Sequence, residues 1–458
     1  MNSNERISTL SLALLYSFRM LGLFMVLPVL SLYMSPESTG KTLEGATPLL
    51  IGLAIGGYGL TQALMQIPFG SLSDRYGRKF LITVGYCLFI SGSLVAAMSD
   101  SIYGIIFGRV LQGGGAVAAC IMALLGDLTS EQTRTRSMAM VGASIGVSFA
   151  ISIVLGPIVD AYWGIHGIFW LTALLGVIGL VILWKMVPNP PNSVYSLETL
   201  STKEGLSKSY FNGELQRVYW GVLILHALLT ALFIFLPTKI IAAFDIEASM
   251  TGWIYLPVVV LGFVLAVPFI LVAEVKRQMK WMMVLAVALM LLVTVSLMAD
   301  VTAGYAMAML LLVFFTAFNL MEATLPSLVA KLASAGTRGS AMGLFSSHQF
   351  LGAFIGGWLG GMALQWKGES FLLMACSGLL VLWLILVTTM QPPKFLKGLS
   401  LPFDLTGDSS SSLEALRQVE GVLEVYHYGE MQTLYIKYDP DLTNEGIIHK
   451  TLQGGRLA

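Results

Sequence analysis

The sequence predicts an all-α membrane protein with twelve transmembrane helices in two pseudo-symmetric six-helix bundles, followed by a small C-terminal α+β domain. Hydrophobic residues make up 56% of the 458 positions and charged residues 11%, whereas soluble domains are about 45 to 50% apolar and about 25% charged. Apolar segments of about 20 residues, long enough to cross a bilayer, recur from near residue 8 to near residue 390. After Met390 the composition becomes that of a soluble domain.

The twelve apolar segments form two groups of six. They are expected at residues 8–33, 48–70, 80–98, 101–125, 137–160, 164–187, 216–240, 250–272, 281–299, 304–331, 340–364 and 370–390. The first contains Arg19 and lacks a small-residue cleavage site, so we interpret it as a retained helix rather than a signal peptide. A stretch rich in Pro, Ser, Asn and charge separates the groups, as is typical of a linker. The predicted units are a first bundle over 1–187, a linker over 188–215, a second bundle over 216–390 and a tail domain over 396–458.

Charge is distributed unevenly between the two sets of loops. The formal net charge is zero, so the composition offers no basic surplus for nucleic acid binding. Basic residues gather in the loops of one side, for example in Arg75–Lys79 and Lys276–Lys280, whereas the opposite loops hold only Lys41, Lys239 and Lys367. Cytoplasmic loops of membrane proteins are enriched in Lys and Arg, so the basic side is predicted to be cytoplasmic, with both termini inside.

The two groups of helices echo each other weakly in sequence. The segment Arg134–Pro157 resembles Thr337–Gly360, because each has an arginine, then small residues, then glycines within an apolar helix. An internal repeat of this kind predicts two pseudo-symmetric bundles that face a central cavity.

The tail is predicted to be a small domain of alternating strands and helices. Strands are expected at 396–404, 422–429 and 433–440, and helices with Ser or Asn caps at 409–421 and 443–454. This order is most of a ferredoxin-like unit, without an evident fourth strand before Ala458. A metal-carrying domain of that shape would show a Cys-x-x-Cys, and no cysteine lies beyond Cys376. Ligand binding or self-association is one role for this domain, and a stabilising cap is the alternative.

No metal site and no organic cofactor is predicted. The three cysteines, Cys87, Cys120 and Cys376, lie in apolar segments without ligand spacing and are expected to be small buried hydrophobes. The sequence has no P-loop, no pair of catalytic aspartates and no His-Glu-x-x-His run. We therefore predict neither an ATP-driven pump nor an enzyme, and expect an ion gradient to supply the energy.

A charged stretch, GSLSDRYGRKF, interrupts the apolar sequence between the second and third segments. From the residues alone it is a basic turn that sets topology, with glycines suited to a tight bend. Its order resembles the Gly-x-x-x-Asp-Arg-x-Gly-Arg-Arg/Lys motif of the major facilitator superfamily. The resemblance implies a conformational latch that locks the outward-facing state, with Asp74 attracted to the positive N-terminal end of helix eleven near Gly339. The implied latch residues are Gly70, Asp74, Arg75, Gly77, Arg78, Lys79 and Asp127.

The fourth segment carries a second resemblance to the same superfamily. Arg109, Gln112, Gly113 and Gly115 match its helix-four motif, an arginine followed by Gln-Gly-x-Gly. The resemblance implies a part for Arg109 in proton coupling. A buried arginine is costly unless it is paired or hydrated, so the alternative is a structural clamp that binds neighbouring helices.

The fifth segment resembles the superfamily's helix-five antiporter motif. The matching helix-packing positions are Gly142, Gly146, Gly156 and Pro157, and Gly-x-x-x-Gly spacing permits close contact between helices. Where the family pattern ends in a glycine pair, this chain has Asp160 and Ala161. That departure leaves antiport and simple packing as alternatives.

The segments around Arg19 and Glu322 resemble in particular the YajR-type branch of the superfamily. Members of this branch carry a C-terminal ferredoxin-like domain, called the YAM domain, and the tail of this chain has the same order of elements. The resemblance covers residues from about 8 to 390 together with that tail. It implies a multi-pass protein of the bacterial cell inner membrane.

Two ionisable residues, Arg19 and Glu322, lie deep inside predicted helices, where such residues usually face the bundle interior and mark a pathway. An apolar site favours the protonated carboxyl group, so Glu322 is the predicted proton acceptor. An Arg19–Glu322 pairing is a hypothesis, and a fixed structural ion pair is the alternative to a coupling role. Further polar residues are candidates for lining the cavity or for single interhelical hydrogen bonds: Gln62, Gln66, His226, Asn319, His348 and Gln349.

Together these features predict a proton-coupled secondary transporter that exports small amphipathic compounds by alternating access. Its expected partners are the lipid bilayer, a small-molecule substrate and protons. One alternative is a membrane transceptor that signals through its tail domain without net flux. Uniport and symport are further alternatives within the transporter class.

Overall fold

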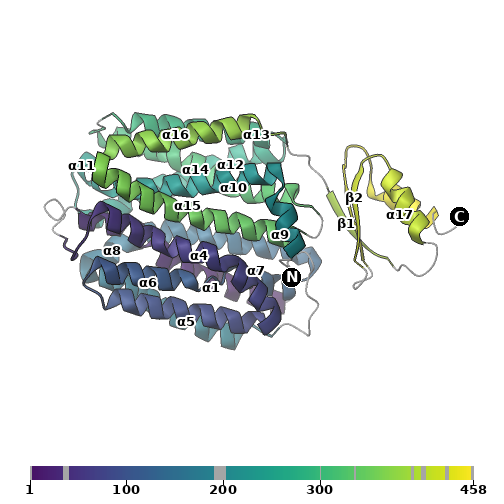
Figure 1. Ribbon diagram of the computed structural model, residues 1–458, viewed down its shortest axis with the longest axis horizontal. Coiled ribbons are helices and arrows are strands. Elements are labelled where there is room, and N and C mark those ends of the chain that lie inside the picture. The colour runs from purple at the N-terminus through teal and green to yellow at the C-terminus, as the bar shows by residue number, and fades with distance from the viewer. Residues whose placement is uncertain are drawn as a thin grey trace.

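The computed structural model describes residues 3–34, 41–189, 203–299, 301–334, 337–392, 397–403, 409–428 and 433–454. Long helices run side by side, and a small domain of strands and helices stands beyond one end of them (Figure 1). The N-terminus lies at the same end (Figure 1). The predicted linker is described only in part, because residues 190–202 lie outside the described residues.

The helices of the first bundle begin and end at local sequence signals. Thr47 accepts a hydrogen bond from Leu50 N at 3.3 Å and so caps the helix that begins at Pro48. Gly77 ends that helix with a φ of 97°, a conformation that side chains disfavour. The elements are α1 (Ser3–Phe24), α2 (Leu27–Leu30), η1 (Ser31–Met34), α4 (Pro48–Tyr76), α5 (Arg78–Ala97), α6 (Ile102–Gly114), α7 (Ala118–Asp127) and α8 (Glu131–Met186).

Glycines interrupt two of these helical segments. The fourth predicted crossing is divided into α6 and α7 at Gly115, whose backbone lies against that of Gly85. The sequence did not predict this break. Helix α8 bends at Gly164, which has a φ of 64°, so it contains the fifth and sixth crossings on either side of the bend.

The second bundle follows a short helix that the sequence did not predict. This helix, α9, lies within the predicted linker and packs against α15. The elements are α9 (Lys203–Tyr210), α10 (Gly213–Phe233), α11 (Leu236–Phe244), η3 (Ala248–Met250), α12 (Thr251–Glu274), α13 (Met279–Ser296), α14 (Gly304–Leu332), α15 (Arg338–Lys367) and α16 (Glu369–Thr388).

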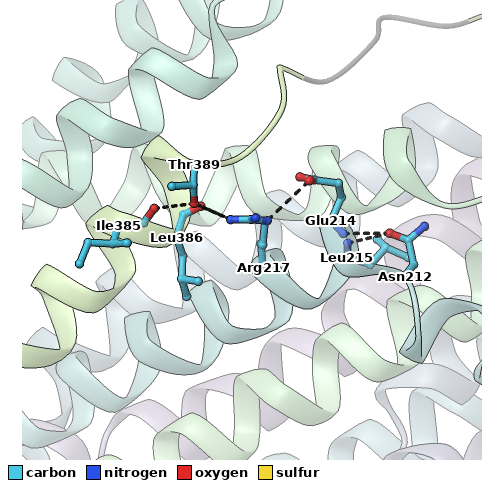
Figure 2. A network of polar contacts seen from close by, with 7 residues as sticks. All are labelled: Asn212, Glu214, Leu215, Arg217, Ile385, Leu386 and Thr389. Atoms are coloured by element: carbon cyan, nitrogen blue, oxygen red, sulfur yellow. Dashed lines mark hydrogen bonds and ion pairs between the residues drawn. The ribbon is translucent and has the colours of Figure 1, made fainter.

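A polar network fastens the start of α10 to the end of α16 (Figure 2). Asn212 caps α10 by accepting hydrogen bonds from Glu214 N and Leu215 N, each at 3.1 Å. Arg217 donates to Leu386 O at 2.9 Å and to the Thr389 hydroxyl at 2.7 Å. The guanidinium thus satisfies carbonyl and hydroxyl groups at the C-terminal end of α16, where a positive charge is favourable.

The described helices account for twelve membrane crossings. Ten spans are long and apolar enough to cross a membrane, and one of them, Arg136–Met186, contains two crossings because of the bend at Gly164. Helix α15 provides the remaining crossing, with a sequence rich in glycine. The predicted all-α membrane fold is confirmed, with boundaries that differ from the predicted ones by a few residues.

The tail domain has the predicted order of strand, helix, strand, strand and helix. Its elements are β1 (Lys397–Pro402), α17 (Ser409–Gln418), β2 (Val422–Tyr428), β3 (Thr433–Tyr438) and α18 (Glu445–Gly454). The strands form one antiparallel sheet in the order β1-β3-β2, with Ile436 opposite both Leu399 and Val425. The apolar residues Leu416, Leu434, Ile436 and Ile448 are fully buried and form the core of this domain.

Candidate functional site

Arg19 is buried in the first bundle and binds neutral oxygens. Its guanidinium donates to the Tyr58 hydroxyl at 2.8 Å, and also to Gln62 Oε1 and to the Gly115 carbonyl. Gly115 lies at the break between α6 and α7, where carbonyls lack regular helical donors. Among the described residues, Arg19 therefore does not form the hypothesised ion pair with Glu322, because oxygens of its own bundle satisfy the guanidinium.

Arg109 is fully buried and connects α6 to α4. It donates to Ala54 O at 3.2 Å and to Gln112 Oε1 at 3.0 Å, and its guanidinium carbon lies 5.0 Å from the centroid of the Tyr58 ring. Gln112 in turn donates to Ser93 Oγ at 2.8 Å on α5. These contacts have the geometry of the structural clamp, one of the two alternatives for Arg109. Tyr58, which contacts both buried arginines, had no distinguishing signal in the sequence.

Glu322 lies in the second bundle with two polar partners. Gln349 Nε2 donates to Glu322 Oε1 at 3.2 Å and lies 2.9 Å from His226 Nε2. His226 Nε2 is 3.6 Å from Glu322 Oε2. The Glu322 side chain is 39% exposed although it lies within a membrane-spanning helix, so this carboxylate faces open space. Three helices, α10, α14 and α15, thus bring together three of the predicted residues.

The remaining predicted polar residues occupy separate places. Gln66 is buried and accepts a hydrogen bond from Gln62 at 2.9 Å. His348 lies 2.8 Å from Leu344 O and stacks on Tyr219, with ring centroids 5.1 Å apart. Asn319 Nδ2 is buried and has no hydrogen-bond partner among the described residues. These three residues do not contact Glu322 directly among the described interactions.

Arg78 is the centre of the charge cluster that the latch motif implied. Its guanidinium pairs with Asp74 and lies 3.3 Å from Asp127 Oδ2, and it donates to Ser73 Oγ at 2.7 Å. The Arg78 side chain is 3% exposed and that of Asp127 is 6% exposed, so this pair is almost entirely buried. We call Ser73, Asp74, Arg78 and Asp127 the Arg78 cluster.

The other motif residues surround this cluster without joining it. Lys79 donates to Val187 O at 2.8 Å, whereas Arg75 is exposed beside the ring of Tyr76. A methyl group on Gly70 would lie 3.5 Å from Ala119 Cβ, an ordinary contact. The expected attraction of Asp74 to helix eleven is not seen in this conformation, because no hydrogen bond or ion pair among the described residues joins Asp74 to α15.

The antiporter-like segment packs closely at one end only. A methyl group on Gly156 would lie 2.5 Å from Met25 O, so α8 and the end of α1 are in backbone contact there. Gly142 and Gly146 have open space instead, and the expectation of close packing at these two positions is wrong for this conformation. Pro157 lies inside α8.

Asp160, which departs from the family pattern, forms a buried ion pair that the sequence reasoning missed. Its carboxylate binds Lys41 and accepts a hydrogen bond from the Tyr33 hydroxyl at 2.7 Å. The side chain of Asp160 is 1% exposed. An ionisable residue within an apolar segment was the available signal, the same signal that singled out Glu322.

Close backbone contacts join the two bundles at one end. Helix α4 packs against α15 (Figure 1), and Gly52 faces the backbone of Gly357 so closely that neither position has room for a methyl group. A methyl group on Gly56 would lie 2.9 Å from Phe354 O. Toward the C-terminal end of α4 the two helices are less close, because a methyl group on Gly343 of α15 would lie 3.9 Å from the nearest atom. We call the contact made by Gly52, Gly56 and Gly59 with Phe350, Phe354, Gly357 and Gly361 the glycine seam.

The glycine seam and the Arg78 cluster mark opposite faces of the protein. The seam lies on the first half of α4, and the Arg78 cluster begins at its last residues. We call the face that carries Arg78, Arg277 and Lys331 the basic face, and the other the seam face. The structure is therefore a conformation in which the bundles are closed at the seam face.

The tail domain binds the basic face through the second bundle. The Lys437 ammonium donates to Lys331 O at 3.0 Å and to Ala333 O at 2.9 Å, both at the C-terminal end of α14. Burial lowers the pKa of Lys437, and the two carbonyls compensate for part of that cost. Asp441 binds the guanidinium of Arg277 in the turn after α12, and this hydrogen bonding lowers the pKa of the Asp441 carboxyl group.

Lys437→Met is expected to weaken the docking of the tail domain about tenfold, because hydrogen bonds to charged groups contribute about 1.5 to 3 kcal/mol. The measurement is the disulfide yield between Arg277→Cys and Asp441→Cys in a background with Cys87→Ser, because Cys87 is exposed and not buried as predicted. The matched control is Lys450→Met, which removes an exposed ammonium from the same domain. An unchanged yield in Lys437→Met would contradict the assigned contact.

The fold and the polar residues of both bundles define a class of protein, the multi-pass transporters built from two six-helix halves. The sequence pattern of the Major Facilitator Superfamily matches residues 12–357, and the chain belongs to that superfamily. It is 42% identical over 454 residues to the inner membrane transport protein YajR of Escherichia coli strain K12, covering 99% of this chain and 98% of that protein. The chain is thus a transporter of the YajR type.

Another relative is similar in sequence, and solved structures share the fold. An uncharacterized transporter of Buchnera aphidicola is 35% identical over 359 residues, 78% of this chain and 90% of that protein. The crystal structure of a bacterial homologue of the human lysosomal transporter Spinster has a TM-score of 0.64 at 13% identity and covers 85% of this chain and 98% of its own. A variant of the nucleoside transporter NupG has a TM-score of 0.63 at 17% identity, over 84% of this chain and 99% of its own.

Proposed function

We propose that this transporter couples the inward movement of protons to the export of small amphipathic compounds by alternating access. The observation that carries the proposal is the Glu322 carboxylate, which is 39% exposed within a membrane-spanning helix and adjoins His226 and Gln349. An ionisable residue at such depth is costly and usually functional. Glu322 takes up the proton, and Gln349 orients the carboxylate by its hydrogen bond.

The proposed orientation has the basic face in the cytoplasm of a bacterial cell and the seam face in the periplasm, across the inner membrane. The supporting observation is the distribution of Lys and Arg between the loops. Both the N-terminal end of α1 and the tail domain lie at the basic face (Figure 1), so both termini are cytoplasmic in this orientation. The present conformation then opens toward the cytoplasm and is the one that accepts a compound for export.

The test is flux in proteoliposomes with an imposed pH gradient, measured with a panel of fluorescent amphipathic compounds. Glu322→Gln removes the titrating group and retains its shape, so gradient-driven flux is expected to fall at least about tenfold, within the range typical of lost proton-transfer groups. Glu369→Gln is the matched control, because Glu369 is also 39% exposed and lies at the end of a membrane helix beside Lys239. Full gradient-driven flux in Glu322→Gln would contradict the proposed coupling role.

A membrane transceptor is the second candidate function. The supporting observation is the attachment of the tail domain to the second bundle through Lys437 and Arg277. A transceptor would change the position of its tail when a compound binds, without net flux in any of the proteoliposome assays. Uniport or symport would instead show flux that is independent of the pH gradient or that follows the protons in the same direction.

A further inference from the structure

The turn between α12 and α13 concentrates positive charge at the membrane surface. Lys276, Arg277 and Lys280 lie within five positions at the basic face, where α12 ends and α13 begins. Arg277 has a φ of 57°, in the left-handed region, and its side chain is 46% exposed. The backbone of this turn therefore projects a guanidinium outward from the ends of two membrane helices.

A cavity of about 300 Å³ lies beside this turn. It is lined by Arg277, Gln278, Lys280, Trp281 and Pro392. Of its lining residues, Arg277 also forms the ion pair with Asp441. The Lys280 ammonium is 5.9 Å from the centroid of the Trp281 ring, and Trp281 is 63% exposed. Exposed Trp side chains at the ends of membrane helices typically lie at the level of the lipid headgroups.

The position of Trp281 indicates that the cavity opens at the headgroup layer rather than into bulk solution. Trp281 is the third residue of α13, directly after Lys280 and four positions after Arg277 along the chain. Pro392 also lines the cavity and follows the end of α16, which Arg217 binds through Leu386 and Thr389 (Figure 2). The lining residues thus lie at or just beyond the ends of membrane-spanning helices.

The Arg277 guanidinium in this cavity already binds an anionic group of the protein itself. Nη1 and Nη2 bind the two carboxylate oxygens of Asp441, the second at 3.2 Å. This two-pronged geometry also suits a phosphate group, which presents paired oxygens at a similar spacing. Both residues of the pair are largely exposed, so another anion has access to the guanidinium.

We propose that this cavity binds the phosphate headgroup of an anionic phospholipid from the adjacent leaflet, and that Asp441 competes with the lipid for Arg277. Arg277 and Lys280 bind the phosphate, and Trp281 lies against the glycerol region. A lipid in the cavity releases the Asp441 contact and leaves Lys437 as the assigned attachment of the tail domain. The lipid composition of the membrane therefore sets how firmly the tail domain docks on the second bundle.

The test uses the full-length protein in bilayers of phosphatidylcholine that contain a small fraction of brominated phosphatidylglycerol, or the same fraction of brominated phosphatidylcholine. The fluorescence difference between the wild type and Trp281→Phe isolates the quenching of Trp281. Stronger quenching by the anionic lipid is expected. Equal quenching by the two lipids would overturn the proposal, because the site would then not distinguish headgroup charge.

Variants connect this quenching to the cavity. Arg277→Gln with Lys280→Gln is expected to lower the preference for phosphatidylglycerol roughly 25-fold, since each basic residue near an anionic surface contributes about fivefold. Lys276→Gln is the control for loss of charge, because it removes one positive charge from the same turn at a residue that does not line the cavity. Its preference is expected to remain well above that of the double variant. An unchanged preference in the double variant would overturn the assignment.

Two further experiments test whether the bound phosphate belongs to a lipid and whether Asp441 competes with it for Arg277. Inorganic phosphate in solution is expected to leave the Trp281 quenching unchanged. If inorganic phosphate efficiently displaces the brominated lipid, the proposed lipid ligand would be overturned in favour of a soluble phosphate. Asp441→Asn is expected to raise the preference for phosphatidylglycerol, because Arg277 loses its internal carboxylate partner. No change in Asp441→Asn would overturn the proposed competition with the tail domain.

Discussion

Gly52→Leu is expected to hold the protein open at the face that the present structure closes. Gly52 lies in backbone contact with Gly357 across the glycine seam, so a larger side chain forces the backbones of α4 and α15 apart. Overpacking of a close-packed interior costs about 1 to 3 kcal/mol, and a backbone obstacle places this variant at the upper end. A cost of about 3 kcal/mol lowers the ratio of closed to open protein roughly a hundredfold.

The measurement is the distance between spin labels on the two bundles, in a background with Cys87→Ser. Labels at Glu44 and Glu247 report the seam face, and labels at Arg75 and Lys276 report the basic face; all four positions are exposed. In Gly52→Leu the Glu44–Glu247 distance at the seam face is expected to lengthen, and the Arg75–Lys276 distance at the basic face is expected to shorten. Flux is expected to fall at least about tenfold, because each transport cycle needs the closed seam.

Gly378→Leu is the matched control for this substitution. Gly378 lies on the membrane helix α16 and has no atom within 4 Å of the position that a methyl group would occupy. The same change in volume should therefore leave both distances and the flux unchanged. An unaltered Glu44–Glu247 distance in Gly52→Leu would show that the seam does not govern closure.

The sequence predicted the membrane helices well because the bilayer imposes a simple requirement, an apolar segment of sufficient length. It did not predict the break at Gly115, where the chain stops being helical although the apolar character continues across it. That break depends on the contact of Gly115 with Gly85, a residue of another helix, and on the Arg19 guanidinium that binds its carbonyl. Such determinants are tertiary contacts, which a local pattern does not contain.

In the candidate site, too, the sequence predicted groupings that follow from residue order but not those that depend on tertiary contacts. Arg78 and Asp74 are four positions apart on either side of the break at Gly77, and a resemblance in residue order was enough to group them with Asp127. The pairing of Arg19 with Glu322 could not be tested by order, since it depends on how two distant helices are rotated. In the described structure Arg19 faces Tyr58, and Glu322 faces Gln349 and His226.

Arg78→Met is expected to destabilise the first bundle and to shift the protein toward the present conformation, which is closed at the seam face. Removal of one partner from a buried ion pair costs about 3 to 5 kcal/mol, because the other charge is left uncompensated. Asp127 is the residue left behind, with a side chain that is 6% exposed. A lower thermal midpoint is expected, together with a longer average Arg75–Lys276 distance.

The Arg78 cluster has two candidate roles, to stabilise the first bundle and to orient Asp74 for a contact with α15. A purely structural role predicts that Arg78→Met lowers the thermal midpoint without a change in the Arg75–Lys276 distance. The double variant Arg78→Met with Asp127→Leu replaces the buried pair with apolar side chains, an exchange that is often neutral for stability. If Arg78 orients Asp74 for a contact with α15 in the opposite conformation, the double variant recovers the thermal midpoint and retains the long Arg75–Lys276 distance. Recovery of both would contradict the orienting role of Arg78, because the Arg75–Lys276 distance would then follow the uncompensated charge of Asp127 rather than the orientation of Asp74.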